Sequence, residues 1–181
     1  MTDVRAISIT SAQSFCDRWH SHHEPPVGGL FALSAWVDDR CVCVAIVSRP
    51  VARMLDALGC AEVVRLASDG SVRGVASALL RACVRECAVR GYDRVVSYTL
   101  VGEVGACYRA ARWRPVALVR GREWTCPSRP RAVSRQPGAK VRWEAGAAAL
   151  PRSMEAQRLC EQHAGQVTLR TRERAQQEMS L

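Results

Sequence analysis

The chain has 181 residues, of which 48% are hydrophobic and 24% charged, a balance typical of one globular domain and too short for two ordinary ones. No apolar run approaches the roughly 18–20 residues of a membrane span, and the first residues lack the basic-then-apolar layout of a signal peptide. We therefore expect a cytoplasmic protein without membrane contact.

The first half of the chain predicts a helix that lies between a strand and a β-hairpin. Ser11 is the candidate N-cap of the helix, because its hydroxyl can accept a free backbone N–H of the first turn. The loop after the helix contains two prolines, which cannot continue it. The expected elements are a strand at Val4–Ile9, a helix from Ser11 through Trp19, a loop at His20–Pro26, and strands at Leu30–Val37 and Cys41–Val47 joined by a turn at Asp38–Arg40.

The second half of the chain contains the longest predicted helix, at Ser71–Arg90, which Gly91 ends. Together with the first half, this order is typical of an α/β fold in which helices cover both faces of a mixed sheet. The other expected elements are a short helix or loop at Val51–Leu58, strands at Cys60–Ala67, Val95–Leu100 and Trp113–Val119, a short helix at Glu103–Ala111, an irregular segment at Thr125–Gly138, and a last strand or docked aromatic ring at Val141–Trp143.

The composition changes after Glu144. Residues 1–144 hold all of the expected core elements, so we interpret them as one domain. Residues 145–181 are first rich in alanine and then polar and charged. We interpret them as a helix-prone or disordered tail with weak contacts to the core.

Positive charge is concentrated in one segment. The net charge of the chain is +9, and Arg112–Arg142 alone carries +8, from nine basic residues and one glutamate. Such a segment favours an anionic partner, which includes cofactor phosphates, nucleic acid and acidic proteins. A bias toward arginine, in a chain whose only lysine is Lys140, would also produce it.

The cysteines indicate reduced thiols. There are nine, an odd number, and several lie within apolar runs, where a thiol behaves as a small hydrophobic side chain. The sequence contains no Cys-x-x-Cys pair, which argues against a zinc knuckle or a redox dithiol.

A strand that leads through small residues into the long helix predicts a phosphate site. The first N–H groups of a helix lack intrahelical acceptors and lie at the positive end of its dipole. Gly70, Gly74 and Ala76 leave the backbone bare enough for a pyrophosphate to approach. The stretch has neither the Gly-Lys-Ser/Thr ending of a nucleotide P-loop nor the full Gly-x-Gly-x-x-Gly of a dinucleotide site.

This stretch resembles the phosphate loop of the GNAT superfamily of acetyl-coenzyme A-dependent N-acetyltransferases, which reads Gln/Arg-x-x-Gly-x-Gly/Ala. Ser71-Val72-Arg73-Gly74-Val75-Ala76 matches it except at Ser71, where Arg73 could compensate. A second family signature has an aromatic residue a few positions before Gly-Phe. It is similar to Tyr108-Arg109-Ala110-Ala111-Arg112-Trp113, with Arg112 in place of the glycine.

The chain also resembles GNAT-like proteins of phages and mobile elements over roughly Val4 to Glu144. The matching stretches are His20-Ser21-His22-His23-Glu24-Pro25-Pro26, Glu62-Val63-Val64-Arg65-Leu66, Tyr98-Thr99-Leu100-x-x-Glu103, Ser128-Arg129-Pro130-Arg131 and Lys140-Val141-Arg142-Trp143.

The resemblance implies a GNAT-like, mostly antiparallel sheet and direct acyl transfer from acetyl-coenzyme A to an amine. Glu62 is the implied general base, through a water, and Tyr108 the implied acid for the thiolate. Each has a structural alternative: an ion pair between Glu62 and Arg65, and aromatic packing by Tyr108. The implied coenzyme-binding residues are Leu66, Ala67, Ser71, Val72, Arg73, Gly74, Val75 and Ala76.

Candidate acceptor-binding residues are the histidines His20, His22 and His23 and the carboxylate of Glu103. The histidines lie beside Glu24 but have no spacing that sets metal ligands on one face, so we expect no metal. They could equally be part of the loop structure, and Glu103 could simply cap the next helix. Besides an acyltransferase, the sequence leaves open a nucleic-acid-modifying or nucleic-acid-binding protein and a binding module without catalysis.

Overall fold

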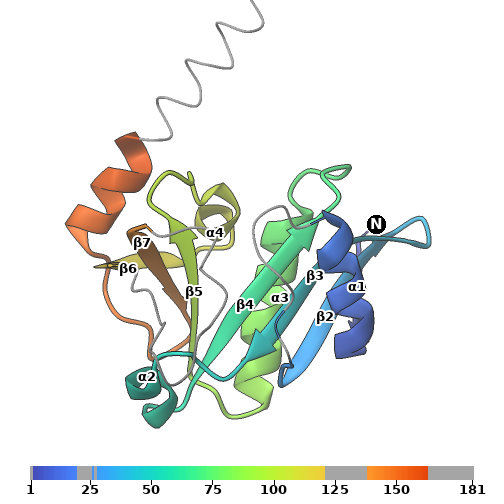
Figure 1. Cartoon of the computed structure of the whole chain (residues 1–181), viewed down its shortest axis with the longest axis horizontal. Coiled ribbons are helices and arrows are strands. Elements are labelled where there is room, and N and C mark those ends of the chain that lie inside the picture. Colours follow the sequence, from blue (N-terminus) through green and yellow to red (C-terminus); the bar gives the residue numbers. More distant parts are fainter. Residues whose placement is uncertain (1, 20–25, 27, 121–137, 163–181) are drawn as a thin grey trace, which may run out of the picture.

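The computed structural model describes residues 2–19, 26, 28–120 and 138–162. These form a seven-stranded sheet in the order β1-β2-β3-β4-β5-β7-β6, with helices on both faces (Figure 1). All neighbouring strands are antiparallel except β4 and β5, which confirms the predicted mixed, mostly antiparallel α/β fold. The elements are β1 (Asp3–Ile7), α1 (Ile9–Trp19), β2 (Phe31–Val37), β3 (Arg40–Ser48), α2 (Arg53–Ala57), β4 (Cys60–Ser68), α3 (Val75–Val89), β5 (Arg94–Leu100), α4 (Ala106–Ala110), β6 (Arg114–Val119) and β7 (Lys140–Ala145).

The alternation of side chains along β3 explains the two layers. Val44 and Ile46 are fully buried against α1, in the same cluster as Cys16. Ala45 points to the other face, where it belongs to the main core cluster with Leu79 of α3. Because successive strand residues point to opposite faces, a continuous apolar strand such as β3 can pack against α1 on one face and α3 on the other.

The first helix begins earlier than the sequence predicts. The amide of Ser11 donates a hydrogen bond of 3.0 Å to the hydroxyl oxygen of Ser8, so Ser8 and not Ser11 is the N-cap. A serine can cap only from the position at which the chain enters the helix, and Ile9 is already helical.

Strand β7 lies between β5 and β6 and pairs antiparallel with both. The predicted strand at Val141–Trp143 is thus confirmed and is an inner strand of the sheet. Trp143 is fully buried and donates its indole N–H to the hydroxyl of Thr99 at 3.0 Å. The indole therefore anchors β7 to β5 through a side-chain bond in addition to the backbone ladder.

The segment after β7 makes closer core contacts than expected. Residues 154–162 are helical, and Ala156 and Cys160 on this helix are buried within the main core cluster. The amide of Ser153 also donates to the carbonyl of Pro115 at 2.8 Å. The expectation of weak core contacts is wrong for residues 145–162, because small apolar side chains at helical spacing make one buried face.

The described cysteines are all free, and six of the eight are buried, which confirms reduced core thiols for this part of the chain. Cys126 lies outside the described residues. None of the described helices is long and apolar enough to cross a membrane.

Candidate active site

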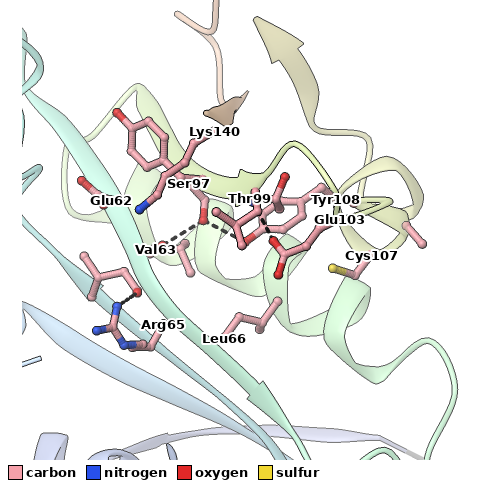
Figure 2. Close-up of a pocket in the computed structure, with 15 residues that line it drawn as sticks. Glu62, Val63, Arg65, Leu66, Ser97, Thr99, Glu103, Cys107, Tyr108 and Lys140 are labelled. Carbon is pink, nitrogen blue, oxygen red and sulfur yellow. Dashed lines mark hydrogen bonds between the residues drawn. The ribbon is translucent and has the colours of Figure 1, made fainter. Parts of the chain in front are cut away.

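The candidate site is a cleft that opens where β4 and β5 separate. The two strands pair for only three residues each, ending at Glu62 and Val96. Beyond Glu62, the β5-facing edge of β4 has no strand partner among the described residues, and a cavity of about 550 Å³ lies there. The cleft is lined by β4, by β5 and the turn after it, by α4 and by the first residue of β7 (Figure 2).

An irregularity in β4 lies at the start of this cleft. Val63 pairs with Val47 and Arg65 with Ile46, so Val64 is an additional residue on β4. A β-bulge of this kind bends a strand and increases its local twist. It therefore helps to turn β4 away from β5 directly after their last pair.

Glu62 is the last residue of β4 that pairs with β5, and it lies in the cleft. It is 7% exposed, and its Oε2 accepts a hydrogen bond of 3.1 Å from the amide of Val51. Burial raises the pKa of the Glu62 carboxyl, while the Val51 amide and the charges of Lys140 and Arg65 act in the opposite direction. A carboxyl whose pKa is raised above its ordinary value binds a proton more strongly, which suits a general base.

Arg65 belongs to the same strand and also lines the cleft. Its guanidinium donates to the carbonyl of Val64 at 2.6 Å. Burial lowers the pKa of the guanidinium, and the charge of Glu62 raises it. The influence of Arg65 on Glu62 is thus electrostatic, and it holds the carboxyl closer to its ionised form.

Tyr108, on α4, lies on the opposite side of the cleft (Figure 2). Its hydroxyl lies 2.8 Å from the Oγ of Ser97, and Ser97 donates to the carbonyl of Val63 at 2.9 Å. Because Ser97 has a single proton, the phenol donates to Ser97. Burial strongly raises the pKa of Tyr108, so its hydroxyl stays protonated.

The ring of Tyr108 also has a packing role. It stacks on Trp143 with a centroid distance of 5.4 Å and meets Trp113 edge-on at 5.5 Å. The predicted alternative, aromatic packing, is therefore present in the structure together with a hydroxyl at the cleft. Both properties belong to one side chain, because a tyrosine has an apolar body and a polar tip.

The predicted phosphate loop connects β4 to α3, but it differs from the sequence prediction in its first residues. The helix starts at Val75 and not at Ser71, because Gly74 has a φ of 78° and is its N-cap. A left-handed residue cannot continue an α-helix, and glycine adopts this conformation without strain. Ser71, Val72 and Arg73 are therefore loop residues, and Val75 and Ala76 form the start of the first turn.

Ser71 has partners within the loop. Its amide and its hydroxyl donate to the Asp69 carboxylate at 2.9 and 2.6 Å, and Arg40 donates to its Oγ at 2.6 Å. Burial raises the pKa of the Asp69 carboxyl, but the bonds from Ser71 and the charge of Arg40 outweigh it and lower the pKa overall. The serine that departs from the family pattern thus stabilises the turn, and Arg40 adds a cation beside it.

The space at this loop is open. A Cβ placed on Gly74 would meet nothing within 4 Å. Arg73 is exposed, and the first N–H groups of α3 have no acceptor within the helix. Bare backbone, unpaired N–H groups and two arginines fit a pyrophosphate group at this position.

The remaining predicted residues have different surroundings. Leu66 lines the cleft, whereas the side chain of Ala67 is buried in the cluster beneath α1. Glu103 also lines the cleft, but its Oε2 accepts from the amide of Leu100 at 2.8 Å, which closes the turn after β5. His20, His22 and His23 lie outside the described residues. Within the described residues, no group of three side chains could hold a metal ion.

Sequence reasoning missed three polar residues of the site: Ser97, Lys140 and Arg40. Ser97 is one of three consecutive hydroxyl residues in β5, and a buried hydroxyl needs a hydrogen-bond partner. Arg40 lies at the start of β3, far from the motifs in the sequence, and Lys140 belongs to a matching stretch that assigned it no role. Only the order of the strands in the sheet brings them to the cleft and the loop.

Comparison with solved structures shows that the chain has the fold of GNAT acetyltransferases. Ribosomal-protein-S18-alanine N-acetyltransferase from Escherichia coli matches with a TM-score of 0.57 and 12% identity, over 85% of this chain and 99% of that one. Arabidopsis thaliana NAA60 in complex with acetyl-coenzyme A matches with a TM-score of 0.59 and 12% identity, over 82% and 100%. A Bacillus subtilis acetyltransferase in complex with coenzyme A matches with a TM-score of 0.53 and 11% identity, over 81% of this chain and 99% of that one.

No family model matches the chain, and no curated protein matches it. At these identities the similarity establishes the fold alone.

Proposed function

We propose that the protein is an acyl-coenzyme A-dependent N-acyltransferase that uses acetyl-coenzyme A and acts on an amine. One observation carries the proposal: the cleft begins where β4 leaves β5, between a buried carboxylate and a phenol. The solved structures with the same fold include complexes with coenzyme A and acetyl-coenzyme A.

The residues of the chain have distinct roles in this proposal. The loop Ser71–Arg73 and the first residues of α3, Gly74–Ala76, would hold the pyrophosphate, with Arg40 beside them. The free edge of β4 at Leu66 and Ala67 would bind the pantetheine arm through its backbone. These groups fit the donor, because the loop is open and, within the part of the chain that the structure describes, this edge of β4 has no strand partner.

Glu62 and Tyr108 would move the two protons of the reaction. Glu62, or a water that it holds, takes a proton from the attacking amine, which then forms a bond to the thioester carbonyl carbon as the carbon–sulfur bond breaks. Tyr108 gives its proton to the leaving thiolate after its hydroxyl turns from Ser97. Lys140 and Arg65 favour the ionised form of Glu62, which keeps the base ready for the amine.

Calorimetry with acetyl-coenzyme A tests the proposal. We expect micromolar binding by the wild type and loss of binding in Gly74→Glu, which places a carboxylate at the pyrophosphate position. Gly91→Glu is the matched control, because Gly91 has a φ of 85° and open space at the other end of the same helix. Binding unchanged in Gly74→Glu, or absent in the folded wild type, would refute the donor site.

A second candidate is a GNAT-fold protein of phage or mobile-element origin that modifies or binds nucleic acid. The charge of +8 over Arg112–Arg142 favours it, because basic residues neutralise phosphates. Retention on heparin that falls steeply with salt, together with binding to DNA or RNA, is the expected result for this candidate. Elution at the salt expected for any protein of this net charge, without nucleic-acid binding, would exclude it.

A further inference from the structure

The only lysine of the chain lies in the candidate active site. Lys140 is the first residue of β7 and extends into the cleft, where its ammonium group points toward Glu62 (Figure 2). Its position is fixed by two backbone ladders, since Lys140 pairs with Leu100 of β5 and with Val119 of β6. A primary amine is therefore held beside the candidate base of an amine acetyltransferase.

The ammonium group takes part in none of the ion pairs among the described residues. Its charge acts on Glu62 from beyond salt-bridge distance, and the Lys140 side chain is only half-buried. No salt bridge in this part of the chain has to break for the amine to move within the cleft. A lysine on a flexible four-carbon stem can reach several positions around its anchored backbone.

We propose that Lys140 is an internal acceptor and that the protein acetylates itself at this residue. The inference depends on the proposed function, which supplies the acyl thioester of coenzyme A. Because amine and base belong to the same folded chain, the transfer to Lys140 is intramolecular once the thioester is bound. Such transfers benefit from large effective concentrations of the nucleophile.

The step is balanced without any further reactant. The ammonium of Lys140 loses a proton to Glu62 or to a water that Glu62 holds, and the free Nζ attacks the carbonyl carbon of the thioester. The carbon–sulfur bond breaks, and the thiolate takes the proton of Tyr108 and leaves as coenzyme A. The second proton that Nζ loses as the amide forms returns to the Tyr108 phenolate. The product is an amide at Nζ, which removes one of the two cations that act on Glu62 and leaves Arg65 as the other.

Among the described residues that line the cleft, the strongest competing nucleophile by residue type is the thiol of Cys107. Burial raises the pKa of this thiol, and the thiolate is the reactive form. Lys140 is therefore the better acceptor, and chemistry separates the two products. Hydroxylamine cleaves an S-acetyl thioester and leaves an N-acetyl amide intact.

Intact-mass spectrometry of the full chain with acetyl-coenzyme A tests the inference. We expect the wild type to gain one acetyl group that resists hydroxylamine, and peptide mapping to place it on Lys140 and not on the terminal amine. Lys140→Arg keeps the charge and should gain none at this position. Glu62→Gln should acetylate itself about 100-fold more slowly, the lower end of a general-base effect.

Three outcomes would overturn the inference. The first is a wild type that binds acetyl-coenzyme A by calorimetry but stays unmodified at Lys140, which would leave the proposed function standing. The second is equal labelling of Lys140 in the chain unfolded by denaturant, because the fold would then contribute nothing. The third is absence of acetyl-coenzyme A binding, which would remove the proposed function as well.

Discussion

The hydroxyl of Tyr108 donates a hydrogen bond of 2.8 Å to Ser97, and the hydroxyl of Ser97 donates in turn to the carbonyl of Val63. Val63 is the first residue of β4 after its last pair with β5. The bond from Ser97 therefore satisfies this carbonyl at the point where the strands separate. The same chain of hydrogen bonds thus links α4, β5 and β4 at the cleft and holds the hydroxyl that we propose as the acid.

Tyr108→Phe separates the acid from the packing role of this residue. The variant keeps the ring that stacks on Trp143 and loses only the hydroxyl. We expect kcat to fall about 100-fold with the KM for acetyl-coenzyme A unchanged, and the free energy of unfolding to fall by about 1 kcal/mol. Steady-state kinetics and thermal unfolding measure both. An unchanged kcat would show that Tyr108 only packs.

Ser97→Ala provides the opposite comparison. It frees the Tyr108 hydroxyl but leaves the Val63 carbonyl without its donor, so we expect a loss of roughly 1–3 kcal/mol in the free energy of unfolding. Urea unfolding of the two variants measures the difference. A smaller loss in Ser97→Ala than in Tyr108→Phe would contradict this account of the hydrogen-bond chain.

Glu62 should make both activity and stability depend on pH. Burial raises its pKa above the ordinary value of 4.5, so the folded state binds the proton more tightly than the unfolded chain. The stabilisation from this proton is complete below 4.5 and is lost as pH rises through the raised pKa. Activity should rise over the same range, because the ionised carboxylate is the base in the reaction that we propose.

Glu62→Gln is the control for this pH dependence. The amide does not titrate, so the melting temperature of the variant relative to the wild type should increase as pH rises through that range. A difference in melting temperature between the two proteins that is the same at all pH values would mean that the carboxyl has the same pKa in the folded and unfolded chain. Rates measured with an amine acceptor should be low in the variant throughout.

Gly105 holds the start of α4 against β7. It has a φ of 61°, and a Cβ at this position would overlap the indole of Trp143. We expect Gly105→Ala to lower the free energy of unfolding by roughly 1–3 kcal/mol and to reduce kcat, because α4 carries Tyr108. Gly102→Ala, where a Cβ meets nothing within 4 Å, should change the free energy of unfolding by less than about 0.5 kcal/mol. Equal effects would refute the steric explanation.

The helix at residues 154–162 should contribute to the stability of the domain. Ala156 is fully buried, whereas Arg158 on the same helix is exposed. We expect Ala156→Asp to lower the free energy of unfolding by at least about 2 kcal/mol, since it buries an unpaired carboxylate, and Arg158→Asp to have little effect. Similar melting temperatures for both would support the sequence-based boundary at residue 144.

The sequence predicted the elements with local signals well. The strand–loop–helix from β4 to α3 is visible because its glycines and its helical spacing lie within one stretch. The errors concern the first residues of two helices, where the sequence offers more than one possible start. Ser8 and Ser11 can each cap a helix, and the sequence around Ser71 has helical character until the left-handed Gly74 interrupts it.

The candidate site was predicted only in part, because its members come from distant strands. Glu62 and Tyr108 were found through motifs, and both line the cleft. Ser97 and Lys140 lie beside or within matching stretches, but these stretches assign them no role, because their places in the site depend on the separation of β4 from β5 and on the position of β7. The packing of Tyr108 between Trp113 and Trp143 likewise depends on strand order, which periodicity does not encode.

The position of β7 has a consequence for biosynthesis. Because Lys140–Ala145 pairs with both β5 and β6, a nascent chain that ends before Lys140 has two strand edges open to solvent. Such edges invite pairing with other chains, and long-range strand pairing is slow to form. Translation must therefore pass residue 145 and clear the ribosome before this half of the sheet can close. Lys140 enters the cleft with β7, so the lining of the cleft is incomplete until this strand has paired.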